Sequence, residues 1–84
     1  MPDHPHAEIA KRLKRANGHL QTIIDMIEEE RPCAEIAQQL QAVEGAIESA
    51  KKALIHDHFS HSLKGAGNKA KALLRDFELI AKYL

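Results

Sequence analysis

Apolar residues recur along most of this chain at alternating spacings of four and three, which is the pattern of one face of an α-helix. The first series comprises Ile9, Leu13, Ala16, Leu20, Ile23 and Ile27. The second comprises Ile36, Leu40, Val43, Ile47, Ala50 and Leu54. A shorter stripe comprises Leu73, Leu74, Phe77, Ile80, Ala81 and Leu84. The spacing therefore predicts an all-α chain of three amphipathic helices.

Two interruptions divide this pattern and set the predicted boundaries. Arg31 and Pro32 end the first segment, because proline has no backbone donor and pushes the preceding residue away from helical angles. The run 64–67 ends the second segment, because its two glycines can adopt left-handed cap angles. We expect one domain over residues 1–84, with a leader over 1–5 and helices over about 5–30, 33–63 and 68–84.

The expected architecture is a long antiparallel helical hairpin followed by a short C-terminal helix. Two long helices joined by a tight break leave much of their apolar seam in water, and two such hairpins would complete a four-helix bundle. All-α chains of only 84 residues often rely on a partner chain. We therefore expect a homodimer at least.

Cysteine usage and hydropathy indicate the compartment. Cys33 is the only cysteine, so it cannot form an internal disulfide, and no charged leader with an apolar core opens the chain. No stretch approaches the roughly 18 apolar residues of a membrane span. We expect a cytoplasmic protein with no membrane partner.

Cys33 and His58 are the first candidates for a metal site. His58 follows Cys33 by 25 residues, about 37 Å along a continuous helix, so the two groups can meet only across two antiparallel chains. Thiolate and imidazole together suit Cu(I), Zn(II), Ni(II) or Co(II). The alternative is that Cys33 is inert and His58 a surface histidine. His61, His4 and His6 could supply further ligands.

Two other functions compete with a metal site. The run from His61 to Gly65 resembles the phospho-acceptor motif of histidine phosphotransfer domains, although only 23 residues follow His61. A helical interaction module without any sensing role is the second alternative. No set of nucleophile, base and oxyanion donors is visible, so we do not expect an enzyme.

Four segments together resemble the small all-helical bacterial repressors of the CsoR/RcnR/FrmR type, which sense copper, nickel and cobalt, or formaldehyde. These segments are 12–19 (RLKRANGH), Cys33, 39–46 (QLQAVEGA) and 54–61 (LIHDHFSH). The resemblance covers nearly the whole chain. It implies dimers that pair into a homotetramer, bind operator DNA without a helix-turn-helix, and release it when an effector binds.

The resemblance also implies roles for individual residues. Cys33 of one chain would bind a transition metal ion with His58 of the partner subunit, and the family's further ligand falls at Ser62. A serine hydroxyl is a poor ligand for soft metals, so a nearby histidine would have to replace it. Glu78 matches the carboxylate that hydrogen-bonds the sensing imidazole in the family, a contact that fixes a ligand's tautomer.

Two further expectations follow from the resemblance. In the formaldehyde-sensing branch, Pro2 would become a secondary amine after loss of Met1 and condense with the aldehyde, which the Cys33 thiolate would then trap. For DNA, the expected contacts are Lys11, Arg12, Lys14, Arg15, Lys51 and Lys52. Acidic and basic side chains number twelve each, so the net charge does not favour DNA binding. The expectation rests instead on the clustering of basic residues along the chain.

Overall fold

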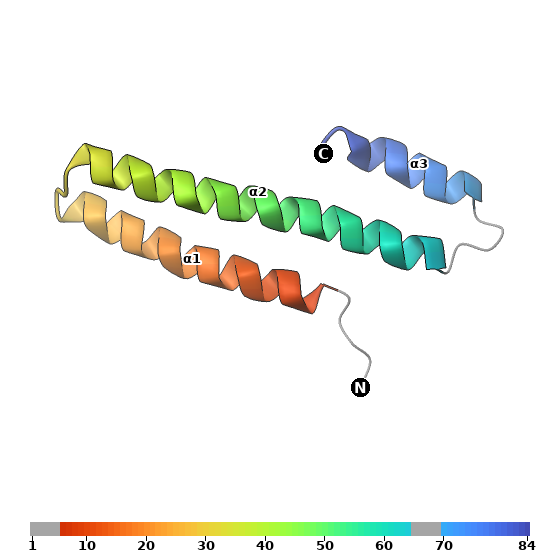
Figure 1. Cartoon of the computed structure of the whole chain (residues 1–84), viewed down its shortest axis with the longest axis horizontal. Helices are drawn as coiled ribbons and strands as arrows, with labels where there is room; N and C mark the ends of the chain where they lie inside the picture. Colours follow the sequence, from red (N-terminus) through yellow and green to blue (C-terminus); the bar gives the residue numbers. More distant parts are fainter. Residues whose placement is uncertain (1–5, 65–69) are drawn as a thin grey trace.

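The computed structural model describes residues 6–64 and 70–84, and these residues form three α-helices. Helix α1 spans Ala7–Glu28, α2 spans Cys33–Lys64 and α3 spans Ala70–Ala81. α1 and α2 form an antiparallel hairpin, and α3 returns beside the second half of α2 (Figure 1). The predicted all-α class, hairpin and short third helix are confirmed. The expected leader and the expected start of the third helix at 68 lie outside the described residues.

The hairpin turn is closed by backbone hydrogen bonds that end α1 two residues before the predicted position. The Glu30 N–H donates to the Ile27 carbonyl at 3.0 Å, and the Arg31 N–H donates to the Met26 carbonyl at 3.0 Å. This pattern is a Schellman cap, and it places Glu30 in the left-handed region with φ 56°. The Pro32 carbonyl then accepts the first hydrogen bonds of α2, so the chain reverses within four residues.

The core of the hairpin is a narrow aliphatic seam between α1 and α2. Its buried members are Ile9, Ala16 and Ile23 on α1 and Val43, Ala50 and Ile55 on α2. Ile23 is the most deeply buried, with 1% of its surface exposed. Beside this seam, His19 Nε2 lies 2.6 Å from Gln39 Oε1, which ties the two helices together through polar side chains. His19 therefore contributes to the packing of α1 on α2.

Helix α3 packs against α2 alone among the described helices, and its contact is much less extensive than that of α1. The rings of Phe59 on α2 and Phe77 on α3 lie 5.4 Å apart. None of the described helices is long and apolar enough to cross a membrane.

The chain forms a single layer of helices. Its extents are 57 × 33 × 13 Å, so its thickness is close to the diameter of one helix. The radius of gyration is 17.5 Å, against about 12 Å expected for a compact domain of this length. Apolar side chains remain exposed along both long helices, among them Leu13, Leu20, Ile24, Ile27, Leu40, Ile47 and Leu54. Because folded domains normally bury a core between two layers, half of the expected core is missing from one chain.

Candidate functional site

His58 lies in the last two turns of α2 and is held from α3. Its Nε2 donates a hydrogen bond to Asp76 Oδ2, and the side chains of His58 and Asp76 are 37% and 36% exposed. The neighbouring Phe59 ring meets the imidazole edge-on, with 5.0 Å between centroids. A neutral imidazole that donates from Nε2 carries its lone pair on Nδ1, so Nδ1 is the atom available to a metal.

The carboxylate that reaches His58 is therefore Asp76, not the expected Glu78. Residues two apart on a helix point about 200° away from each other, so α3 cannot present both carboxylates to α2. Glu78 is exposed on α3. The sequence pattern did not identify Asp76, because an apolar stripe alone does not fix which face of α3 meets α2. An acidic residue at that spacing carries no distinguishing signal of its own.

A second group of polar side chains surrounds Asp57, on the side of α2 that faces α1. His6, which precedes α1, brings its Nδ1 to 3.8 Å from Asp57 Oδ2. His61 donates from Nδ1 to the Asp57 carbonyl oxygen at 2.9 Å, within the same helix. Both His6 and His61 thus lie within one or two helical turns of His58.

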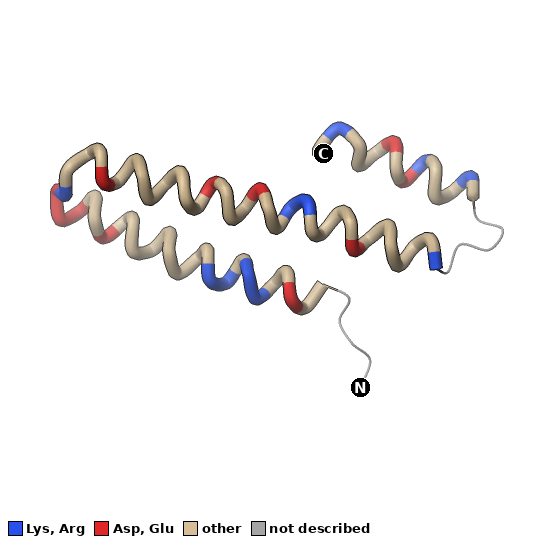
Figure 2. Tube along the Cα trace, viewed as in Figure 1, with Lys and Arg blue, Asp and Glu red and all other residues tan. Residues whose placement is uncertain are grey.

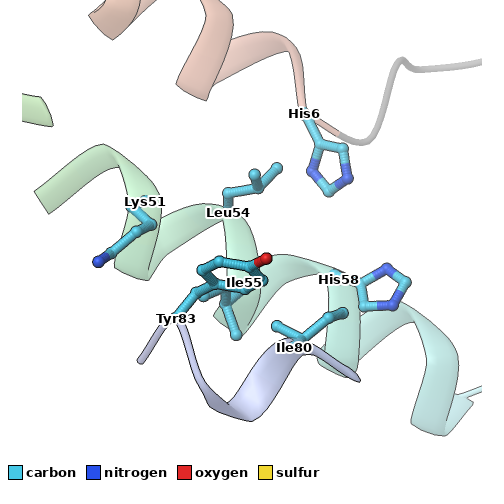
Figure 3. A pocket seen from close by; sticks show the side chains of 7 residues that line it. All are labelled: His6, Lys51, Leu54, Ile55, His58, Ile80 and Tyr83. Atoms are coloured by element: carbon cyan, nitrogen blue, oxygen red, sulfur yellow. The ribbon is translucent and has the colours of Figure 1, made fainter. Parts of the chain in front are cut away.

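An apolar cavity of about 460 Å³ opens beside His58. Its lining residues are His6, Lys51, Leu54, Ile55, His58, Ile80 and Tyr83. Figure 3 shows Ile55, Ile80 and the Tyr83 ring close together, with the two imidazoles on one side of them. The cavity brings together α2, α3 and the start of α1, and it joins the uncovered apolar surface at Leu54.

Cys33 lies at the opposite end of α2 from His58. It is the first residue of the helix, and its thiol is free and exposed. Close to it, the Arg31 guanidinium forms an ion pair with the Glu35 carboxylate at 2.8 Å. An unbroken α2 holds the thiol and the imidazole apart within one chain, so the structure does not bring the two predicted ligands together.

The donor set of one chain fits a metal only incompletely. Among residues 6–64 and 70–84, no group of three or more His, Cys, Asp or Glu side chains could hold a metal ion. Ser62 lies one turn after His58 and offers only a hydroxyl, a weak ligand for soft metals. Two further candidates, Pro2 and His4, lie outside the described residues.

The basic residues of α1 form an exposed surface, which we call the α1 basic face, comprising Lys11, Arg12, Lys14 and Arg15. None of the four makes an ion pair with another described residue. Figure 2 shows this positive segment in the first half of α1 and acidic residues toward the hairpin turn. Lys51 and Lys52 differ, because both lie near one carboxylate, Glu48, at 3.4 and 3.8 Å. The α1 basic face is therefore the stronger candidate for phosphate contacts.

Comparison with known families places nearly the whole chain in one of them. Residues 5–83 match the family described as "Metal-sensitive transcriptional repressor". No solved structure matches the chain.

Curated relatives agree with this match. The copper-sensing transcriptional repressor CsoR of Mycobacterium ulcerans is 38% identical over 55 residues, which are 66% of this chain and 47% of the relative. RicR of Mycobacterium tuberculosis, also named a copper-sensing repressor, is 39% identical over 57 residues, 68% of this chain and 59% of the relative. CsoR of Bacillus subtilis is 30% identical over 79 residues, 90% of this chain and 78% of the relative. The match thus spans only about half the length of the two mycobacterial relatives.

Proposed function

Because the chain belongs to the family of metal-sensitive transcriptional repressors, which are not enzymes, we propose that it represses transcription by binding operator DNA and releases that DNA when a metal ion binds between two chains. The observation that carries this proposal is the placement of the two candidate ligands. A thiol begins α2 and an imidazole lies near its end, while the apolar side of the helix between them is uncovered.

Antiparallel pairing of α2 with the same helix of a second chain would unite these features. The midpoint between Cys33 and His58 falls at residues 45 and 46, so a two-fold axis there would bring Cys33 of each chain to His58 of the partner subunit. The exposed residues Leu40, Ile47 and Leu54 lie on one side of α2 around that midpoint. Burying them would supply the missing half of the core and two equivalent metal sites. The further pairing of dimers into a tetramer is part of the proposal and is supported by the family resemblance.

The chemistry of the donors favours copper among the candidate metals. A thiolate and an imidazole are soft and borderline ligands, which suit Cu(I) and also accept Zn(II), Ni(II) or Co(II). Several relatives are named copper-sensing, which supports Cu(I) as the first ion to test. His61, three residues after His58, and His6, which lies near Asp57, are described histidines that could complete the ligand set.

The contact between His58 and Asp76 offers a route from the metal to the shape of the assembly. Asp76 belongs to α3, which has few other contacts, so a ring that reorients on binding metal would carry α3 with it. A coupling of about 1–3 kcal/mol between metal and DNA would change DNA affinity roughly 5- to 150-fold. DNA itself would be held by the α1 basic face, repeated in every chain, with affinity that falls steeply as salt rises.

The test measures DNA release while each candidate effector is titrated. A labelled operator fragment is followed by fluorescence anisotropy as Cu(I), Ni(II), Co(II) or Zn(II) is added, with formaldehyde in a parallel arm. We expect release by a metal and loss of that response in Cys33→Ala and in His58→Gln. His56→Gln is the matched control, because His56 lies on the same helix but is exposed and points about 200° away from His58.

Mixing the two inactive variants tests whether the site lies between chains. A mixed dimer of Cys33→Ala with His58→Gln contains one complete pair of ligands, whereas each variant alone contains none. Random mixing should therefore restore metal binding to about a quarter of the parent stoichiometry. No recovery in the mixture would contradict a shared site. Release by formaldehyde alone, abolished by Pro2→Ser, would replace the metal with an aldehyde effector.

A further inference from the structure

Gly18 lies in the interior of α1, where no contact among residues 6–64 and 70–84 accounts for a glycine. A Cβ added at this position meets no atom of these residues within 4 Å, so none of the described helices needs the space. Glycine in the middle of a helix destabilises it relative to alanine, because it loses more backbone freedom on folding. Gly18 therefore lowers the stability of α1, and no close contact among the described residues requires a glycine there.

The position of Gly18 on α1 places it among the basic side chains. Lys14 and Arg15 lie one turn before it, and Lys11 lies two turns before it, on the same side of the helix. Ala16, which is buried against α2, is two residues away and so points about 200° in the other direction. Gly18 is exposed, and the backbone of α1 is therefore bare on the outward side of the α1 basic face.

The next turn carries two uncharged side chains, Thr22 and Gln21, and the Gln21 amide donates to Asp25 Oδ1 at 3.2 Å. The Thr22 hydroxyl donates to the Gly18 carbonyl oxygen at 3.3 Å, so that side chain lies along the helix instead of projecting from it. The surface thus has long cationic side chains at one end and no projecting side chain at Gly18. A flat polyanionic strand could lie against such a surface while the cations reach its phosphates.

We propose that Gly18 is the point at which the sugar–phosphate backbone of bound DNA makes its closest approach to α1. This inference rests on the proposed function and adds a steric element to it: the cations supply attraction, and the missing side chain lets the strand come near enough for them to act. The partner is a nucleic acid backbone, because the side chains one and two turns before Gly18 are cationic and form no ion pair with a described carboxylate.

Gly45 on α2 provides a matched comparison. It too is an interior helix glycine, and no atom in the described part of the chain lies within 4 Å of an added Cβ. Its surroundings differ in charge, because Glu44 precedes it and Glu48 lies one turn after it. Replacing either glycine by alanine should stabilise its helix to a similar extent, but only the change at Gly18 should affect DNA.

The experiment compares Gly18→Ala, Gly18→Gln and Gly45→Ala with the parent chain. The probe is a DNA duplex of about 40 base pairs and arbitrary sequence at about 50 mM salt, because phosphate contacts are independent of sequence and strongest at low salt. We expect Kd to rise about threefold or more in Gly18→Ala and more than about tenfold in Gly18→Gln, and to stay within about twofold of the parent in Gly45→Ala. Both alanine variants should melt about 2–6 °C higher than the parent.

Each other result has a definite meaning. If the parent does not bind the duplex even at low salt, the proposed function fails. If the parent binds and the Gly18 variants bind equally well, the proposed function stands and the role of Gly18 is wrong. If Gly18→Ala changes the oligomeric state measured by sedimentation, the glycine serves contact between copies of the chain, which also overturns the inference.

Discussion

The contact of His58 with Asp76 determines which ring nitrogen of His58 is available to a metal ion. Its Nε2 is engaged by Asp76, and Nδ1 is left to face a ligand. The family resemblance points to Glu78 as the carboxylate beside this imidazole, whereas within one chain the contact is made by Asp76. The difference follows from the rotation of α3, since residues 76 and 78 lie on nearly opposite sides of the helix.

Replacing Asp76 by Asn should weaken metal binding. The amide keeps the size of the side chain but has no charge and can pair with either tautomer, so it favours the Nε2–H form that exposes Nδ1 less than the carboxylate does; loss of such contacts typically costs 10- to 100-fold in metal affinity. Cu(I) affinity can be measured by competition with a chromophoric chelator. Glu78→Gln is the control and should bind within about twofold of the parent. The opposite ranking of the two variants would return the role to Glu78.

The hairpin turn shows that backbone hydrogen bonds set the end of α1, and amino-acid composition does not reveal these hydrogen bonds. A Schellman cap needs a residue in the left-handed region after the last helical turn, and glycine usually occupies that position. Here Glu30 occupies it, with φ 56°, and its charge also lies at the negative end of the α1 dipole. The hydrogen bonds of the turn therefore hold Glu30 in a backbone conformation that a residue with a side chain normally avoids.

Glu30→Gly should consequently stabilise the protein, in contrast to most glycine substitutions. Relief of the left-handed conformation is worth about 1 kcal/mol in the free energy of unfolding. Glu29→Gly provides the control, because Glu29 has φ −85° and gains nothing from glycine. Urea denaturation at fixed protein concentration should show a higher midpoint for Glu30→Gly and a lower one for Glu29→Gly. Equal destabilisation by both would show that the cap tolerates Glu30 without strain.

The apolar periodicity and the helix-breaking residues predicted where the helices lie in the sequence. They did not predict which faces of α2 and α3 meet. The spacing of apolar residues located α1 and α2, and Pro32 fixed where α2 begins. The last turn of α1 was placed two residues too far along, because the cap hydrogen bonds at Glu30 and Arg31 leave no trace in an apolar pattern. The rotation of α3 could not be predicted, since a short helix with one apolar stripe fits α2 in several registers.

One chain forms a single layer of helices, so a partner chain must cover its apolar face and complete its candidate sites. A chain 13 Å thick exposes apolar side chains that a four-helix bundle would bury, and both candidate sites are incomplete in it. The thiol and the imidazole lie at opposite ends of α2, and the α1 basic face has only four cations. Pairing of two chains would place the thiol of one beside the imidazole of the other, and it would double the number of cations available to DNA.

Ile47→Glu should therefore dissociate the assembly. Ile47 is 48% exposed in one chain and lies at the centre of the proposed α2 pairing, where a buried carboxylate would have no partner. Sedimentation equilibrium should show at least tenfold weaker association, roughly 1.4 kcal/mol or more, and Tm should fall and depend more steeply on concentration. Ser49→Glu introduces the same charge on the opposite side of α2 and should leave association intact. Parent-like association of Ile47→Glu would place the interface elsewhere.

The thinness of the chain has a consequence for genomes that encode several such repressors. A leucine and isoleucine seam attracts any similar seam, so paralogues made in one cell would form hybrids unless something discourages mispairing. The charged residues that border the seam, Glu44 four positions after Leu40 and Lys51 four positions after Ile47, are placed to impose that discrimination. Fidelity of gene regulation would then depend on a few ionic side chains at the border of the seam.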